Sequence, residues 1–398
     1  MTTSIKVASS AISSRISITE ALAGHRNSLG LIRLVLASVV IVDHAFPLGG
    51  FGHDPFLRWF HSQTSLGGLA VAGFFAISGY LIAKSGMSGD VMQFMWRRIL
   101  RIFPAYWALL IVTAFVIGPI LWKLADGSIS EYFAGTPLGS TPYFYVLGNW
   151  TTQLHTFAIY DIFVATTPYG LSIGGSALNG SIWTLMYEWR SYLIIGFLVI
   201  FGVLTRARII VPILMLTFLA LQIIGNINWD VLVTMVPSFM ADAYMLNLGF
   251  TFLIGSTIAV YSHKIPFDIR LGIFAGVVVV LSLGFGGFNT IGLLAGAYFV
   301  LFLAAWLPRQ TQWIGQKNDY SYGVYIYGFL VQQTLAFFGL YHWGFVPFVL
   351  IAWVMSLGLA WLSWHGVEKW AMALKNWGPG RGLRVWGHKI SAPFSRSS

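Results

Sequence analysis

The first candidate for chemistry is a pair of ionisable residues inside an apolar run. From Arg33 the chain reads RLVLASVVIVDHAFPLGG, which places Asp43 and His44 where a membrane helix would carry apolar side chains. His44 lies about three helical turns and roughly 16 Å beyond Arg33, so these two share a face, and Asp43 points about 100° away. Ionisable groups at that depth usually face a polar cavity and serve a function. We therefore predict that His44 is a general base, since imidazole titrates near neutral pH; the alternative is a buried histidine bonded to a neighbouring helix.

A carboxylate lies near the start of a later apolar segment. Glu188 lies in NGSIWTLMYEWRSYLII and is followed by Arg190. If this helix descends while the first ascends, Glu188 and His44 reach similar depths, and a carboxylate beside an imidazole can stabilise the imidazolium. Glu188 could instead contact Asp43 or face external water. A contact with Arg190 is disfavoured, because residues two apart do not face each other on a helix.

Two arginines precede a third apolar segment. Arg98 and Arg101 lie three apart in WRRILRIFPAYW, residues 96–107, and so share a helical face. Guanidinium groups suit phosphates, and a nucleotide-bearing donor would bring several of them. The same pattern is also typical of positive anchors and lipid-headgroup contacts at the cytoplasmic surface.

Small residues mark the segment GGLAVAGFFAISGYLIAKS. Gly68, Ala72 and Ala76 recur every four residues, which predicts a face that packs closely against another helix. Ser78 and Tyr80 in the same segment could instead line a polar path.

Metal and cofactor patterns are missing from the sequence. The chain has no cysteine, which excludes disulfides, thiolate ligands and a cysteine nucleophile. It contains no HExxH motif, no phosphate-binding loop and no dinucleotide-binding fingerprint. We expect no metal site and no bound cofactor.

The elements that position these residues must be membrane helices. Of the 398 residues, 57% are hydrophobic and 9% charged, whereas soluble domains carry about a quarter charged residues. Long continuous apolar runs predict an all-α, polytopic transmembrane bundle and exclude an alternating barrel. We predict about ten spans, at 31–50, 67–84, 101–122, 182–204, 209–225, 243–262, 271–287, 289–307, 320–340 and 345–365.

The distribution of basic residues predicts the orientation. With the N-terminus inside, all Lys and Arg residues but Arg58, Lys123 and Arg190 fall on the inner side. The positive-inside rule then places both termini in the cytoplasm. The net charge of +10 follows this membrane pattern, so we expect membrane lipids and no nucleic acid as partners.

Three regions follow from this topology. Residues 1–28 form a polar, weakly basic segment that we expect to be a cytoplasmic tail and not a signal peptide. Residues 29–368 form the transmembrane domain, with an outer loop at about 123–181, and residues 369–398 form a basic cytoplasmic tail. Trp150 in the outer loop could rest at the membrane interface or line a glycan-binding surface.

Five motifs in order resemble the acyltransferase-3 family of membrane O-acyltransferases. Arg33 and His44 resemble its R-x10-H signature, and GFFAISGYLI, RRILRIFPAYW and YSYGVYIYGFLVQQ resemble three further motifs. The Glu188 segment is similar to its tryptophan–leucine–glutamate motif, in which an aromatic residue usually follows; Ser191 and Tyr192 keep part of that pattern. The resemblance covers about residues 29–365.

The resemblance implies an enzyme of the bacterial inner membrane that moves an acyl group, often acetyl, from cytoplasmic acyl-CoA to a hydroxyl of a glycan or lipid-linked sugar of the cell envelope or exopolysaccharide. It implies catalytic roles for His44 and Glu188, and donor binding by Arg33, Arg98 and Arg101. Direct transfer and a covalent acyl relay both remain open.

Two other functions fit the same sequence. A glycan transporter or exporter would use the polar cavity as a path, but we see no internal repeat of the kind that marks many transporters. A noncatalytic partner of envelope-assembly proteins would tolerate conservative replacement of His44 and Glu188. We favour acyl transfer.

Overall fold

The computed structural model describes residues 16–24, 27–135, 139–238 and 240–378. Within these ranges the regular structure is helical, apart from one isolated bridge between Ser17 and Pro266. The all-α prediction is confirmed. Most of the predicted tails, namely residues 1–15, 25–26 and 379–398, lie outside the described residues.

Each predicted span contains a helix. These are α2 (Leu29–Leu48), α4 (Leu66–Gly86), α5 (Val91–Val112), α10 (Thr184–Ile200), α12 (Ile210–Ile227), α14 (Ala243–Tyr261), α15 (Ile269–Phe285), α16 (Leu293–Trp306), α17 (Ser321–Phe337) and α18 (Phe345–Ser363). In the described part of the chain, seven helices are long and apolar enough to cross a membrane. They indicate a multi-pass membrane protein, and the count of ten stays a prediction.

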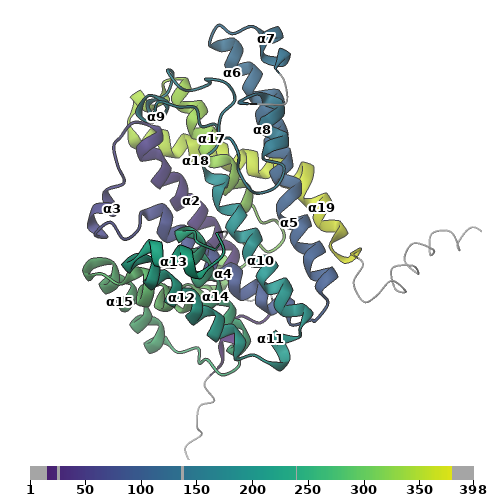
Figure 1. Ribbon diagram of the computed structural model, residues 1–398, viewed down its shortest axis with the longest axis vertical. Helices are drawn as coiled ribbons and strands as arrows, with labels where there is room; N and C mark the ends of the chain where they lie inside the picture. Colours follow the sequence, from purple (N-terminus) through teal and green to yellow (C-terminus); the bar gives the residue numbers. More distant parts are fainter. Residues whose placement is uncertain (1–15, 25–26, 136–138, 239, 379–398) are drawn as a thin grey trace, which may run out of the picture.

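Shorter elements connect these helices. They are α1 (Ile18–Ala21), α3 (Pro55–Trp59), α6 (Gly118–Leu124), α7 (Ile129–Ala134), α8 (Pro142–Gly148), α9 (Pro168–Ile173), α11 (Val203–Arg206), α13 (Trp229–Met235) and α19 (Lys369–Ala373), with the 3-10 turns η2 (Ser181–Trp183), η4 (Arg309–Thr311), η5 (Leu340–Trp343) and η7 (Leu374–Asn376) and the π-helical turns η1 (Thr113–Ile117), η3 (Phe288–Gly292) and η6 (Trp364–Glu368). The predicted outer loop therefore holds α7, α8 and α9. In Figure 1, α6 and α7 project at the opposite end of the molecule from α11.

The helix that contains the third predicted span begins ten residues before that span. The side chain of Asp90 accepts a hydrogen bond from the backbone N–H of Gln93 and caps α5 at Val91. An N-cap stabilises a helix start irrespective of where the apolar pattern begins, so the helix extends beyond the predicted span of 101–122. Arg98 and Arg101 consequently lie within a rod of 34 residues that continues through η1 to the end of α6.

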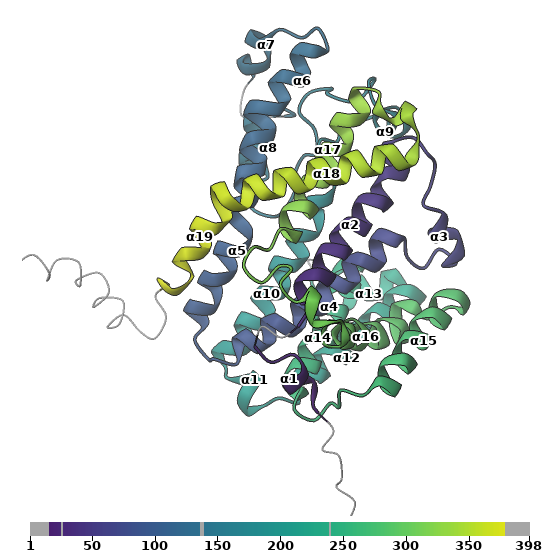
Figure 2. The same cartoon turned by 180° about the vertical axis from the view of Figure 1, so that it is seen from behind.

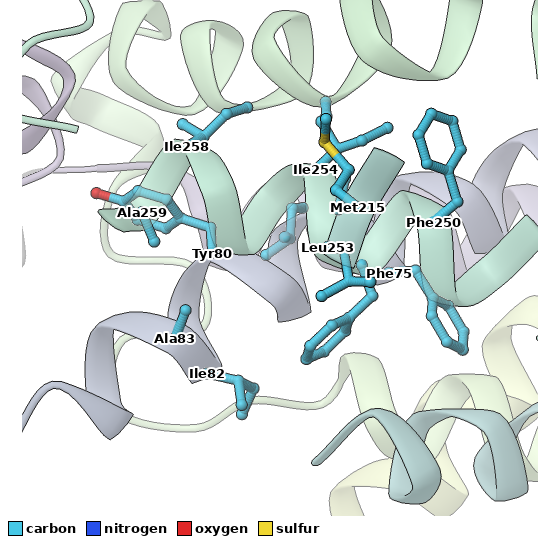
Figure 3. Close-up of a cluster of buried hydrophobic side chains, with 14 of the residues drawn as sticks. Phe75, Tyr80, Ile82, Ala83, Met215, Phe250, Leu253, Ile254, Ile258 and Ala259 are labelled. Carbon is cyan, nitrogen blue, oxygen red and sulfur yellow. The ribbon is translucent and has the colours of Figure 1, made fainter. Parts of the chain in front are cut away.

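Helices α4 and α14 pack with their backbones in contact. A Cβ atom at Gly79 would meet the backbone of Phe252, and one at Gly255 would meet the carbonyl oxygen of Ala76. Small residues allow such an approach, so the predicted packing face is confirmed at Ala76. Figure 3 shows the apolar side chains beside this contact, with Met215 of α12 against α14. Gly68, by contrast, faces Thr64.

Helix α2 lies between two packed groups of helices. It packs against α4 on one side and against α17 on the other, and α17 packs in turn against α18 (Figures 1 and 2). Gln332 of α17 donates a hydrogen bond of 2.8 Å to the carbonyl oxygen of Ile41 on α2. The helix that carries Arg33 and His44 is therefore fixed between α4 and α17.

Candidate active site

The predicted site residues line two cavities. The inner cavity has a volume of about 270 Å³ and lies at the end of the bundle predicted to face the cytoplasm. Its polar lining comprises Arg33, Arg97, Arg98, Arg101, Glu188, Ser78, Thr184, Tyr192, Ser321, Tyr322 and Tyr325. The outer cavity has a volume of about 490 Å³ and contains His44 and Asp43 in its lining.

Arg33 and Arg101 meet on one carboxylate. Each guanidinium lies 2.5 Å from Oδ2 of Asp319, in the segment before α17. Oδ1 of Asp319 accepts hydrogen bonds from the backbone N–H (3.1 Å) and the hydroxyl (2.5 Å) of Ser321. Burial opposes ionisation of Asp319, but Arg33 and Arg101 outweigh it and hold the pKa of this carboxyl well below its usual range. The two cations thus share this anion, and a second buried carboxylate, Glu368, also interacts electrostatically with Arg101.

Sequence reasoning missed Asp319. It is the single acidic residue between Asp268 and Glu368, in a stretch that carries Arg270, Arg309 and Lys317. A lone acid on the basic side of a membrane protein, next to a polar motif, was a signal for an internal ion pair.

Arg98, unlike Arg33 and Arg101, forms no ion pair with a carboxylate among the described residues, and neither does Arg97. Within the same residues the Nε atom of Arg98 is buried without a hydrogen-bond partner. Its guanidinium carbon lies 5.9 Å from the ring centre of Phe94. Arg97, its neighbour, donates to the side-chain oxygen of Asn376 at 3.1 Å. Arg98 is thus the side chain in this lining best placed to meet an anionic ligand.

Glu188 belongs to the inner cavity and not to the His44 cavity. It accepts hydrogen bonds from Ser78 Oγ at 3.1 Å and from the hydroxyl of Tyr192. The sequence analysis considered a carboxylate beside the imidazole, but in the structure the side chain next to His44 Nδ1 is that of Ser181. Ser181 faces His44, and Glu188 lies seven residues, or roughly 10 Å, further along the same helical path.

His44 contacts a serine and an aromatic ring. Its Nδ1 atom lies 3.4 Å from Ser181 Oγ, and its ring meets Phe329 edge-on at 5.4 Å between centres. When Nδ1–H donates to Ser181, Nε2 keeps its lone pair and can accept a proton. Asp43 lines the same cavity but lies against Gly67, where a Cβ atom would collide with its carboxylate.

Val71 and Tyr325 line both cavities. The hydroxyl of Tyr325 donates a hydrogen bond of 2.9 Å to the carbonyl oxygen of Ser181 and lies 2.5 Å from Thr184 Oγ1. These two side chains therefore lie at the boundary between the cavity that holds the arginines and the cavity that holds the histidine. Sequence reasoning did not single out Tyr325, although it lies in the YSYGVYIYGFLVQQ motif.

This fold and site define a multi-pass helical membrane protein with an arginine-lined cavity next to a histidine-lined one. A family model described as an acyltransferase domain matches residues 26–365, and the chain belongs to this acyltransferase family, as the motifs predicted. A protein named O-acetyl transferase from Shigella phage Sf6 is 32% identical over 86% of this chain and 95% of its own length. Nodulation protein 10 of Rhizobium leguminosarum bv. viciae is 28% identical over 88% of this chain and 95% of its own length. No solved structure matches the chain.

Proposed function

We propose that this acyltransferase is an O-acyltransferase of the bacterial inner membrane. It takes an acyl group, most simply acetyl, from cytoplasmic acyl-CoA and places it on a hydroxyl of a glycan or lipid-linked sugar of the cell envelope or exopolysaccharide. The single observation that carries this proposal is the pair of cavities, which share Val71 and Tyr325 as a wall. Acyl transfer needs two substrates, a donor and an acceptor, and each would have a cavity of its own. The relative named O-acetyl transferase supports acetyl as the group transferred.

The inner cavity suits the donor. Arg98 would pair with a phosphate of CoA, because its guanidinium has no carboxylate of its own. The Arg33–Asp319–Arg101 cluster keeps α2, α5 and the segment before α17 together. Glu188 lines the same cavity, so its role would be to accept hydrogen bonds from the donor and to position Ser78 and Tyr192.

The outer cavity suits the acceptor. His44 Nε2 would take the proton of the acceptor hydroxyl while that oxygen attacks the acyl carbon. The carbon–sulfur bond of the thioester then breaks, and the sulfur takes up a proton to leave as the CoA thiol. General base catalysis contributes about 10²–10⁴-fold in rate. An acyl relay through the imidazole would use the same residue.

Membrane vesicles that contain the protein test this function. The vesicles receive labelled acetyl-CoA, and the label is followed into the glycan and lipid-linked fractions. We expect transfer by the wild type and a loss of at least 10²-fold in His44→Ala at equal protein levels. His342→Ala is the matched control, because His342 lines neither cavity.

Two outcomes would contradict the proposal. One is the absence of label from every fraction when an acceptor pool is verified and other acyl-CoAs are tried; that result would favour a transporter. The other is full transfer by His44→Ala, which would remove the histidine from the chemistry.

A further inference from the structure

One wall of the outer cavity is built from amide side chains. Gln222 comes from α12, Asn247 from α14 and Asn289 from the π-helical turn η3. Gln222 Nε2 donates to the carbonyl oxygen of Asn289 at 3.0 Å, and Asn247 Nδ2 donates to Asn289 Oδ1 at 3.3 Å. Asn289 Nδ2 donates to the carbonyl oxygen of Gln63 at 3.1 Å. These bonds fix three amides from distant parts of the chain in one surface, and π-helical turns are frequent at functional sites.

This wall contains a buried acceptor atom that the protein leaves unpaired. Gln222 is 6% exposed, and its Oε1 atom has no hydrogen-bond partner among the described residues. Gln63, in the same lining, differs: its Oε1 accepts from the backbone N–H of Phe288 at 2.8 Å. A buried polar atom without a partner is costly. Because Gln222 lines the cavity, we take this oxygen as the atom that a donor group of a bound ligand would meet.

The charges of the outer cavity differ from those of the inner one. The described residues that line the outer cavity include no lysine and no arginine, and they carry one carboxylate, Asp43, and one imidazole, His44. A phosphate or carboxylate at the amide wall would have no permanent cation to pair with. Amides, by contrast, donate to and accept from hydroxyl groups without any charge.

Aromatic side chains complete the lining. Trp183, Trp229 and Tyr244 all face this cavity, and the rings of Trp183 and Tyr244 meet at 4.7 Å between centres. Trp229 and Tyr244 are 41% and 60% exposed, so their rings remain accessible. Flat apolar faces together with a few convergent polar groups are typical of sites that bury and orient a small ligand. A ring with C–H faces and equatorial hydroxyls matches both parts of this lining.

We propose that Gln222, Asn247 and Asn289 form the acceptor subsite and that it takes an uncharged sugar ring. Gln222 Oε1 accepts a hydrogen bond from one sugar hydroxyl, the other amides bind its neighbours, and the aromatic rings cover its apolar face. The reacting hydroxyl then points to His44, which lines the same cavity. This inference rests on the proposed function and names the chemical class of its acceptor.

The test uses the full chain, purified in nanodiscs with labelled acetyl-CoA. The probes are neutral methyl hexosides and 6-deoxyhexosides, each set beside the methyl hexuronide of matching configuration. We expect acetyl transfer to at least one neutral glycoside and at least tenfold lower kcat/KM for its uronide, because the carboxylate meets no cation.

Substitution of the unpaired amide gives the second arm. Gln222→Met keeps the length of the side chain and removes the acceptor, and we expect it to raise KM for the neutral glycoside at least tenfold while KM for acetyl-CoA changes less than twofold. Gln333→Met is the matched control. Gln333 is also buried, also donates to a backbone carbonyl (2.8 Å, to Ala177) and also has an unpaired Oε1, but it lines neither cavity. Its KM values should match those of the wild type.

Asn247→Ala covers the case in which Gln222→Met does not fold. It should raise KM for the glycoside in the same direction and leave KM for acetyl-CoA unchanged. Uronides used as well as neutral glycosides, or unchanged glycoside KM in both variants, would overturn the subsite. Transfer of acetyl to a different class of acceptor would overturn it and leave the acyl-transfer function intact. Failure to consume acetyl-CoA with every acceptor would refute the proposed function itself.

Discussion

The hydroxyl of Tyr325 donates a hydrogen bond of 2.9 Å to the carbonyl oxygen of Ser181. The side chain of Ser181 lies 3.4 Å from Nδ1 of His44, the predicted base. Ser181 therefore connects Tyr325, in the wall between the cavities, to His44. Tyr325 also lies 2.5 Å from Thr184 Oγ1, on the inner side of the wall. Tyr325 therefore links the wall between the cavities to the serine that contacts the histidine.

Replacement of this phenol should separate its two roles. Tyr325→Phe keeps the ring, and with it the wall, but removes the bond to Ser181; a lost buried hydrogen bond costs about 1–3 kcal/mol, so we expect roughly 5- to 150-fold slower transfer. Tyr325→Ala removes the ring and should raise CoA release that is not matched by acyl transfer, because water reaches the thioester. Measurement of CoA release and labelled product in parallel gives the ratio. Tyr327→Phe, on the same helix and outside both cavities, should behave as the wild type.

Arg98→Ala should weaken donor binding specifically. A hydrogen bond to a charged partner contributes about 1.5–3 kcal/mol, so KM for acyl-CoA should rise about 10- to 150-fold while KM for the acceptor changes little. Arg270→Ala, on an exposed position of the same predicted side, serves as the control. Steady-state kinetics with each substrate varied in turn provide the measurement. If Arg98→Ala instead raised KM for the acceptor and left KM for acyl-CoA unchanged, the assignment of Arg98 to donor binding would be contradicted.

Glu188→Gln distinguishes a donor-side role from a partnership with His44. Because Glu188 bonds Ser78 and Tyr192 in the inner cavity, we expect a raised KM for acyl-CoA and an unchanged pH dependence of kcat/KM. A shift in that pH profile, with KM for the donor unaffected, would instead show that the carboxylate acts on the imidazole. Glu131→Gln, in the exposed loop helix α7, is the matched control.

The Asp319 cluster should contribute to stability in a pH-dependent way. Asp319→Asn leaves two guanidiniums without their anion, and removal of one partner from a buried pair costs about 3–5 kcal/mol, which should appear as a lower Tm in detergent. The pKa of Asp319 lies below that of an unfolded aspartate, about 3.9, so this stabilisation is full above about pH 5 and declines as the pH falls below 4. The difference in Tm from the wild type should therefore narrow in acid. Asp161→Asn, at an exposed position, should show no such difference at any pH.

Two glycines should respond in opposite ways to the same substitution. In Gly255→Ala the new methyl group meets the carbonyl oxygen of Ala76, a backbone atom that cannot rotate away, so we expect a loss of about 1–3 kcal/mol. In Gly284→Ala, within α15, no atom lies within 4 Å of the new methyl group, and we expect no loss or a small gain. Thermal unfolding of both variants in the same detergent makes the comparison. Equal Tm values would show that the contact between α4 and α14 is less tight than described.

Much of this architecture could be predicted from the sequence, because long apolar runs indicate membrane helices. The segments around Arg33, Arg98 and Glu188 were placed on helices correctly, and the family was identified from their motifs. The start of α5, ten residues before the predicted span, was not predicted because the Asp90 cap acts locally and independently of hydropathy. Boundaries of this kind depend on one side chain.

The relations between site residues were harder to predict. Arg33, Arg98, Arg101 and Glu188 all line the inner cavity and His44 lines the outer one, but their roles in catalysis and donor binding stay predictions. The carboxylate of Asp319 pairs with Arg101, 218 residues away in the sequence, and with Arg33, 286 residues away. The amide wall likewise joins α12, α14 and η3. Such pairings depend on long-range packing, which residue spacing along one helix does not encode.

The wall formed by Val71 and Tyr325 has a consequence for the cell as well as for the reaction. If the inner cavity opens to the cytoplasm and the outer cavity to the opposite side of the membrane, these two side chains lie on the barrier between the aqueous compartments. An apolar constriction of one layer can be dry enough to stop ions. The same two residues would then be part of a permeability barrier. A wider passage would admit larger acyl groups, but it would also let ions flow under the membrane potential, and this leak would limit its width.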